Sequence, residues 1–391
     1  MSDVFVIAQG GGPTAVINQT VAGAVLEARK RFPSARILGA RHGVRGIRNG
    51  DFVELSRLTD TDLRRLADTP NAGLGSTRDK PDEKYCAEIL DGLRKVEAKA
   101  FIYIGGNDTS GTLAILDKAA GGSMTFLHAP KTIDNDLVEN DHTPGFISAA
   151  WFVAHAFLST DLDFRAMPGI YVGIVMGRHA GFLTAAGQAW RRDERDGPHL
   201  VYVPERSFST QQFLADVAAM RDRHGRCVVA MSEGVHGDDG KPVIESLLGD
   251  RVERDAHGNV QLSGGDLGLA VQSALTAAFP KVRARVDTFG YLPRAFSGLV
   301  SPVDRQEAFD IGAFAIATHA EGSASIALRH EVGQGSGKTV LARVPLDAVA
   351  AKTRLMPADF LAASGTALAA PGRAYFDRLV PAAPDIFTGI L

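Results

Sequence analysis

Short apolar runs that end in glycine and are followed by helix-like sequence recur along this chain, and this pattern constrains the fold most. One such run covers residues 3–8 and ends at the glycines 10–12. Another covers residues 100–104 and ends at the glycines 105–106. Strands that alternate with helices in this way form parallel sheets covered on both faces. The sequence therefore predicts an α/β fold.

The same pattern predicts more elements than one small domain holds. A chain of 391 residues exceeds the usual domain size of roughly 150 residues. We therefore expect two Rossmann-like three-layer lobes with mainly parallel sheets and an active site in the cleft between them. Helices are predicted from near Thr14 and over about 109–119, and further strands at 36–40, 124–129, 170–176, 200–203, 226–231 and 284–289. The glycine-rich stretches 234–240 and 249–265 predict loops or a hairpin.

Charge and composition exclude several classes of protein. The 42 basic and 45 acidic residues give a net charge of −3, so the chain has no excess of positive charge that would indicate binding to nucleic acid or an anionic membrane. The apolar runs are shorter than the roughly 18–20 residues of a membrane span, and the first one is too short for a signal peptide. The two cysteines have no metal-site or disulfide spacing. We expect a cytoplasmic protein with small-molecule substrates.

The two glycine loops are candidates for binding phosphate. Loops beyond the carboxyl ends of parallel strands bind ligands, and glycines let backbone N–H groups approach an anion at a helix N-terminus. Neither loop follows a dinucleotide or P-loop pattern, so each alone could also be a tight turn. Asn107 and Asp108 either cap the next helix or hold Mg²⁺ bound to a phosphate compound.

The loop from Lys131 to Asp136 has the densest group of charged side chains that could take part in catalysis. If the loop is extended, Asp134 and Asp136 point the same way. One carboxylate could act as general base, the other could bind metal, and Lys131 could neutralise a phosphate. The alternative is a solvated turn with an Asx motif.

Arginines near other strand ends suit phosphate recognition, although any one could be an exposed rim residue. These are Arg78 in the loop 74–78, Arg178 after the strand at 170–176, and Arg283, Arg285 and Arg294 around the run 284–289. We interpret His42, His128 and His179 as core or surface residues, because their spacing fits no metal site.

Taken together, these motifs resemble the phosphofructokinase family in their order from residue 4 to about 320. The shared segments are Gly11-Gly12 with Asn18, 74–78, 105–108, 130–136, 176–178, 232–234, 290–294 and 304–305. The resemblance implies phosphoryl transfer to the C1 hydroxyl of fructose 6-phosphate, a step of glycolysis, with Mg²⁺ as cofactor. It also implies a homodimer or homotetramer with site residues that cross the interface.

The resemblance also implies roles for single residues. Asp134 matches the general base, and Arg78 matches the cation on the transferred phosphoryl group. Asp108 and Asp136 are the candidate metal ligands. Gly11 and Gly106 match the phosphoryl-donor loops, and Thr132 and Asp136 contact sugar or metal. Positions for the sugar phosphate are matched by Met176, Gly177, Arg178, Glu233, Arg285, Tyr291 and Arg294. By this resemblance, residues 1–140 and about 289–325 form the donor lobe, and residues 141–288 and about 326–391 form the sugar-phosphate lobe.

The identity of the phosphoryl donor follows from two positions. In ATP-using members the residue that matches Asp108 is glycine, and the one that matches Lys131 is usually small. Here a carboxylate takes the space of an α-phosphate, and a lysine is available for a terminal phosphate. The pattern resembles the pyrophosphate-dependent branch, with a reversible reaction and with Asp108 and Lys131 in the catalytic set.

Departures from the family keep other hypotheses open. Asn107 replaces an aspartate that binds Mg²⁺ in ATP-using members. Gly169 replaces an arginine that comes from a neighbouring subunit, and Arg165 is close in sequence but not aligned with it. The alternatives are an ATP-dependent sugar-phosphate kinase and a non-catalytic sugar-phosphate-binding protein. Sedoheptulose 7-phosphate is a further candidate acceptor.

Overall fold

The computed structural model describes residues 3–248, 264–332 and 337–386, and it divides into two compact units. The first unit comprises Met1–Ala149 and Arg294–Arg354, and the second comprises Ala150–Pro293 and Leu355–Leu391. The sequence-based division assigned residues 326–391 to the second lobe, and it differs from the structure over residues 326–354, which belong to the first unit. The strands at Ala324–Glu331 and Lys338–Val344 instead join the sheet of the first unit through Ala324 beside Leu127.

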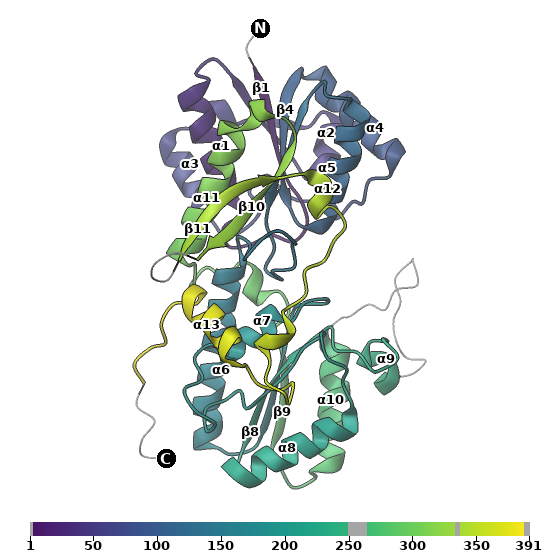
Figure 1. Ribbon diagram of the computed structural model, residues 1–391, viewed down its shortest axis with the longest axis vertical. Coiled ribbons are helices and arrows are strands. Elements are labelled where there is room, and N and C mark those ends of the chain that lie inside the picture. The colour runs from purple at the N-terminus through teal and green to yellow at the C-terminus, as the bar shows by residue number, and fades with distance from the viewer. Residues whose placement is uncertain (1–2, 249–263, 333–336, 387–391) are drawn as a thin grey trace. The chain divides into compact units, whose positions relative to one another are not determined.

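The first unit contains a largely parallel sheet with the strand order β11-β10-β5-β4-β1-β2-β3. The edge pairs β2–β3 and β10–β11 are antiparallel, and the other pairs are parallel. Helices cover both faces, as expected for an α/β fold (Figure 1). The strands are β1 (Val4–Gln9), β2 (Arg36–Ala40), β3 (Phe52–Glu54), β4 (Ala98–Gly105), β5 (Thr125–Pro130), β10 (Ala324–Glu331) and β11 (Lys338–Val344).

Two core clusters lie on the opposite faces of this sheet. One face packs against α1 (Ile17–Arg31), α3 (Asp60–Ala67) and α11 (Pro302–Ala317). The other packs against α2 (Val44–Asn49), α4 (Glu83–Lys95), α5 (Asn107–Ala120) and α12 (Leu346–Val349). The first helix begins at Ile17 and not near Thr14, because Gly11 turns the chain with a φ of 73° and Ala15 and Val16 form a further turn.

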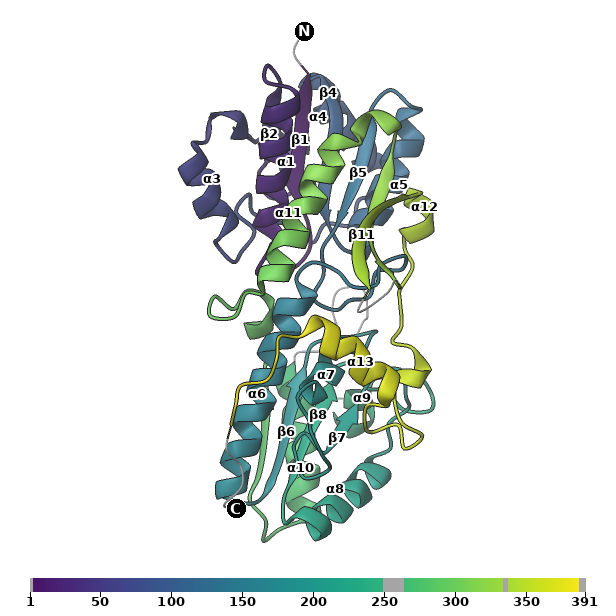
Figure 2. The ribbon, with the colours of Figure 1, turned by 60° about the vertical axis from the view of Figure 1, so that its left-hand side comes forward.

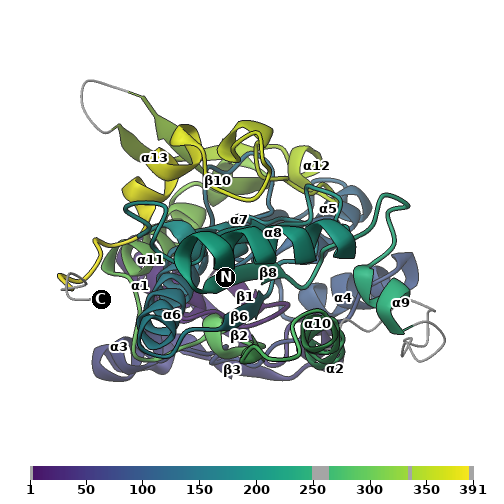
Figure 3. The ribbon, with the colours of Figure 1, turned by 90° about the horizontal axis from the view of Figure 1, so that it is seen from below.

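The second unit contains a parallel sheet with the order β7-β8-β6-β9, so the expected α/β fold is confirmed. Figures 2 and 3 show its helices on both faces. The strands are β6 (Ile170–Val175), β7 (Leu200–Tyr202), β8 (Cys227–Ser232) and β9 (Ala284–Thr288). The helices are α6 (Phe146–Ala166), whose first four residues belong to the first unit, α7 (Phe182–Ala185), α8 (Thr210–His224), α9 (Val243–Leu248), α10 (Gly264–Ala278) and α13 (Ala370–Leu379).

The polar stretch that follows β8 forms a short hairpin-like turn. His236 and Pro242 make an antiparallel bridge, so the turn predicted for 234–240 is confirmed. Residues 249–263, where more loop was expected, lie outside the described residues. In the part of the chain that the structure describes, no helix has both the length and the apolar character needed to cross a bilayer.

Helices α1 and α11 pack backbone against backbone in the first unit. A side-chain carbon at Gly23 would fall on the carbonyl oxygen of Phe309, and one at Gly312 would fall on that of Thr20. Both positions therefore need a residue without Cβ. This contact matters for function because α11 carries acidic side chains that hold the candidate site.

We expect Gly23→Ala to lower the free energy of unfolding by about 2 kcal/mol, because the added methyl group overpacks the contact between α1 and α11. Gly111→Ala in α5 is the matched control, since a methyl group added there would have nothing within 4 Å of it. That control should be neutral or slightly stabilising. Urea denaturation of both variants measures the difference, and equal stabilities would contradict the described packing.

Candidate active site

Three neighbouring strands of the first unit end at the same edge of its sheet. Strands β1, β4 and β5 are adjacent and parallel, and Gly105 pairs with Pro130 at that edge. The loops that follow them are the two glycine loops and the loop from Lys131 to Asp136. The structure therefore brings together segments that are far apart in the sequence, at the edge where α/β proteins bind ligands.

The first glycine loop is held to the loop that carries Arg78. The N–H of Gly11 donates to the carbonyl oxygen of Thr77 at 2.9 Å, and the Ser76 hydroxyl donates to the carbonyl oxygen of Gly11 at 2.6 Å. Gly11 has a φ of 73°, which favours glycine. Arg78 follows Thr77 directly and is exposed. The two candidate phosphate loops are thus one connected structure.

Lys131 is a buried cation at this edge. Its side chain is 3% exposed, and its Nζ donates to the carbonyl oxygen of Gly12 at 2.7 Å. Burial and the nearby charge of Arg294 lower the pKa of Lys131 to about 8, whereas Asp134 and Asp136 act in the opposite direction. These charged residues therefore share one region with the glycine loop.

Arg294 lies beside the same glycine loop. A side-chain carbon at Gly12 would lie 3.0 Å from the Cζ atom of Arg294, and the arginine belongs to the first unit. The resemblance matched this arginine with a sugar-phosphate position. The structure places it close to the loops that we expected to hold the donor, which adds a second positive charge beside Lys131.

The loop that contains Asp134 and Asp136 is not extended. Asn135 is buried and has a φ of 59°, so the condition under which the two carboxylates would align by strand-like alternation is not met. The two are nevertheless close in space. Burial, with the charge of Asp134, raises the pKa of Asp136 to about 7. This carboxylate would gain from a nearby cation.

The second glycine loop adds oxygen atoms to this acidic region. The Asn107 amide donates to Asp136 Oδ2 at 3.0 Å, while the Asn107 Oδ1 atom is buried without a hydrogen-bond partner. Asp108 lies in the first turn of α5 and pairs with Lys80 at 3.3 Å, where both side chains are mostly exposed. Within the described residues, no three His, Cys, Asp or Glu side chains form a ready metal site.

Helix α11 anchors the chain that follows the acidic loop. The buried Asp304 accepts hydrogen bonds from the N–H groups of Gly145 and Ser148 at 2.8 and 3.0 Å. Gly145 forms a β-bridge with Thr132, so this anchor reaches the candidate site. Burial raises the pKa of Asp304 to about 6.

A second anchor on α11 involves a histidine that sequence reasoning missed. The buried His142 contacts Asp141 through Nδ1 at 2.8 Å and Glu307 through Nε2 at 2.7 Å. Burial alone would lower its pKa, but the hydrogen bonds to both carboxylates outweigh burial and raise it to about 9. The imidazole is therefore a cation between two acids. Asp141 precedes His142 in the sequence, but no local pattern indicates Glu307.

In the second unit, most of the candidate sugar-phosphate residues follow the carboxyl ends of three neighbouring strands, β8, β6 and β9. The Ser232 hydroxyl donates to the carbonyl oxygen of Gly177 at 2.7 Å, and the N–H of Glu233 donates to that of Val175 at 2.9 Å. Gly234 lies directly against the backbone of Arg178. The N–H of Phe289 donates to the carbonyl oxygen of Ile174 at 3.0 Å. Met176, Gly177, Arg178, Glu233 and Tyr291 thus lie at one edge of this sheet.

Arg285 does not lie with them. It pairs with Tyr171 near the amino ends of β9 and β6, and Met176 and Tyr291 follow the opposite ends of these strands. The structure therefore does not bring Arg285 together with the other sugar-phosphate candidates of the same chain.

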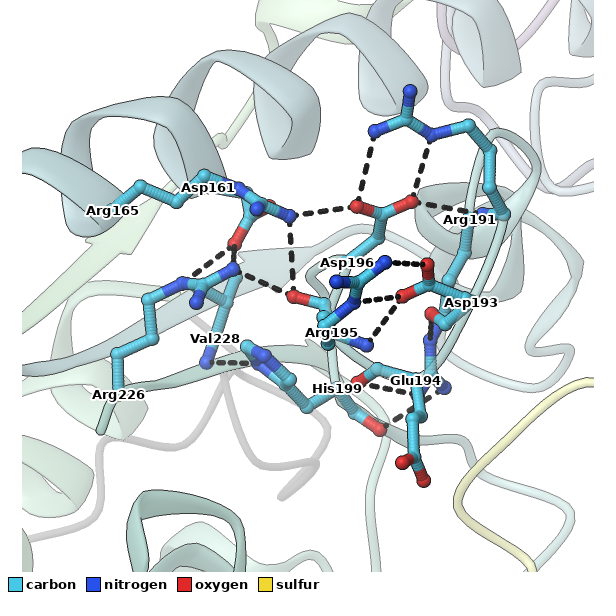
Figure 4. A network of polar contacts seen from close by, with 11 residues as sticks. Asp161, Arg165, Arg191, Asp193, Glu194, Arg195, Asp196, His199, Arg226 and Val228 are labelled. Atoms are coloured by element: carbon cyan, nitrogen blue, oxygen red, sulfur yellow. Dashed lines mark hydrogen bonds and ion pairs between the residues drawn. The ribbon is translucent and has the colours of Figure 1, made fainter. Parts of the chain in front are cut away.

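Arg165 is part of a buried polar network in the second unit (Figure 4). It donates to Asp161 at 2.9 Å and to Asp196 at 2.7 Å. Arg226 donates to the other oxygen of Asp161 at 2.8 Å. Because these contacts hold the Arg165 guanidinium between two acids, it serves the packing of α6 against the segment around Asp196.

Comparisons with known proteins agree on one family. A family model described as phosphofructokinase matches residues 4–319. A pyrophosphate–fructose 6-phosphate 1-phosphotransferase of Rhodospirillum rubrum is 51% identical over 366 residues, which cover 92% of this chain and 90% of that protein. One of Xanthomonas campestris pv. campestris is 34% identical over 386 residues, with 95% and 90% covered. The crystal structure of a pyrophosphate-dependent phosphofructokinase from Nitrosospira multiformis has a TM-score of 0.86 at 28% identity, with 100% of this chain and 95% of that chain covered.

The contacts of His142 predict a pH-dependent stability. Its folded-state pKa of about 9 exceeds the ordinary 6.5, so its contribution is fully present below pH 6.5 and is lost as the pH rises through 9. The loss amounts to about 3 kcal/mol by linkage. Denaturation curves between pH 6.5 and 9.5 should therefore show a steeper loss of stability for the wild type than for His142→Gln.

Asp304 does not interfere with this test, because its raised pKa of about 6 places its titration below that pH range. Parallel stability profiles of the wild type and His142→Gln would show that the imidazole is not held as a cation.

Proposed function

The chain belongs to the phosphofructokinase family, and we propose that it transfers a phosphoryl group from pyrophosphate to the C1 hydroxyl of fructose 6-phosphate, giving fructose 1,6-bisphosphate and phosphate. The two curated relatives carry the name of this activity and span nearly the whole chain. The observation that carries the proposal is the buried Lys131 ammonium at the first glycine loop. A small, highly charged anion suits a buried cation better than a neutral ribose or base does.

The charges of the first unit support named roles in this reaction. Asp134 is the proposed general base for the sugar hydroxyl, and Arg78, Lys131 and Arg294 are the proposed counter-ions of the phosphate groups. Phosphoryl transfer needs this arrangement because positioning and charge stabilisation supply most of the rate. Gly11 and Gly106 are proposed to supply backbone groups around the donor, and Thr132 is proposed to contact the sugar or the metal. Asp108, by its charge and volume, would disfavour a donor with an α-phosphate.

The oxygen atoms around Asp136 fit a hard divalent cation. Asp136 has a raised pKa, and the Asn107 Oδ1 atom is buried without a partner, so both would gain from Mg²⁺. We propose Asp136 and Asp108 as its carboxylates, with the amide oxygen of Asn107 as a further ligand. Mg²⁺ bound there would neutralise negative charge on the phosphate oxygens.

The second unit is the proposed site for the sugar phosphate. Arg178, Glu233 and Tyr291, with Met176 and Gly177, lie at one sheet edge and offer charge and hydrogen bonds to a phosphorylated ketose. Arg285 lies at the other end of β9. Its proposed contact with the sugar phosphate therefore requires a second copy of the chain, which fits a homodimer or homotetramer. A cytoplasmic location remains a prediction.

A panel of donors tests the proposal. With Mg²⁺ and fructose 6-phosphate, pyrophosphate should support rapid formation of fructose 1,6-bisphosphate, and ATP should support little or none. Asp134→Ser should lower kcat by roughly 10²–10⁴-fold while sugar binding is retained. A wide preference for ATP would favour the rival sugar-phosphate kinase, and a protein that binds sugar phosphate without turnover would favour the binding-protein hypothesis. Sedoheptulose 7-phosphate as a parallel acceptor defines the ketose preference.

A further inference from the structure

A segment beyond the matched family region lies against the acidic loop. The family model ends at residue 319, and the segment that follows α12 returns to residues 135–137 of the first unit. Thr353 forms an antiparallel bridge with Leu137, and the N–H of Arg354 donates to the carbonyl oxygen of Asp136 at 2.7 Å. The backbone that follows Asp134, the candidate general base, is therefore paired with residues 353–354.

The side chain of Arg354 extends the same contact. Its Nη1 atom donates to the carbonyl oxygen of Asp141 at 2.6 Å. It also contacts the side-chain and backbone oxygens of Asn135 at 3.3 and 3.4 Å. One guanidinium thus ties the two ends of the stretch 135–141 together.

Asn135 is the residue whose conformation orients the acidic pair. It lies between Asp134 and Asp136, and its φ of 59° lies in the left-handed region, which costs a non-glycine residue roughly 1–2 kcal/mol. Asparagine tolerates this region when its side chain is hydrogen-bonded locally. Since Arg354 binds both oxygens of Asn135, it stabilises the turn that sets the directions of the two carboxylates.

The rest of the loop has independent support, so the effect of Arg354 should be local. Leu137 packs in an apolar cluster with Ala327, Val344 and Val349. The Asn140 side chain accepts a hydrogen bond from the N–H of Leu328 at 2.9 Å. Loss of the guanidinium would therefore loosen the turn at Asn135 and leave the loop attached to its unit.

We propose that Arg354 is a positioning residue for phosphoryl transfer, which holds the turn at Asn135 so that Asp134 and Asp136 face the reactants. The inference rests on the proposed function. Arg354 acts through the loop, by its contacts with Asn135 and with the backbone of Asp136 and Asp141. Its Nη1 atom makes all three of these side-chain contacts, and the rigid planar guanidinium holds this nitrogen in a fixed direction, whereas the flexible stem of lysine would not.

The test compares Arg354→Met and Arg354→Lys with the wild-type chain in the pyrophosphate assay, together with thermal unfolding. Arg329→Met is the matched control. Arg329 comes from the same late part of the sequence and pairs with Glu139 of the same loop, where both side chains are about half exposed. We expect Arg354→Met to lower kcat by about 10–100-fold, because a small displacement of a catalytic group has this effect. KM for both substrates should stay within about threefold of the wild-type values.

The control and the conservative variant make the outcome decisive. Arg329→Met should keep kcat within about twofold, and Arg354→Lys should fall between the wild type and Arg354→Met, with the unfolding temperature of each variant close to that of the wild type. If Arg354→Met fails to fold, the kcat of Arg354→Lys is the test. A kcat of Arg354→Lys equal to that of the wild type would overturn the inference. A wild-type kcat in Arg354→Met would also overturn it. An inactive wild type would instead contradict the proposed function.

Discussion

The buried ammonium group of Lys131 is the interaction on which the candidate site depends. A cation that is 3% exposed is costly unless charges or ligands compensate it. Here the compensation comes from the carbonyl oxygen of Gly12 and from the acidic pair Asp134 and Asp136, while Arg294 opposes it. Lys131 and Arg294 therefore place two positive charges beside the first glycine loop. A small polyanion is the ligand that such a site favours.

The surrounding fold holds these charges in place from several directions. Parallel strands bring the loops after β1, β4 and β5 to one edge. Helix α11 fixes the chain after the acidic loop through Asp304 and Glu307, and its close contact with α1 needs glycine at positions 23 and 312. The last part of the first unit adds β10, β11 and the segment that ends at Arg354. Residues from opposite ends of the unit thus position one short loop.

Much of this could be predicted from sequence, because apolar runs followed by glycine are local signals. The strand at 36–40 has the predicted limits, and the segments near Gly11, Gly106 and Lys131 do lie together. The turn at Asn135 could not be predicted, since its left-handed backbone depends on contacts with Arg354, more than 200 residues away in the chain. The pairing of His142 with Glu307 was missed for the same reason. The late strands β10 and β11 carry no motif that assigns them to the first unit.

The most direct test of this dependence on Lys131 is the affinity for inorganic pyrophosphate, measured by calorimetry on the wild type, Lys131→Met and Lys99→Met. Lys99 is a matched control because it is a half-exposed lysine that pairs with Asp3 and lies near the amino end of β4, opposite the glycine loops. We predict that Lys131→Met weakens pyrophosphate binding by about 100-fold or more and leaves fructose 6-phosphate binding unchanged, and that Lys99→Met changes either affinity by less than about threefold. Equal pyrophosphate affinities of Lys131→Met and the wild type would contradict the role given to the buried ammonium group.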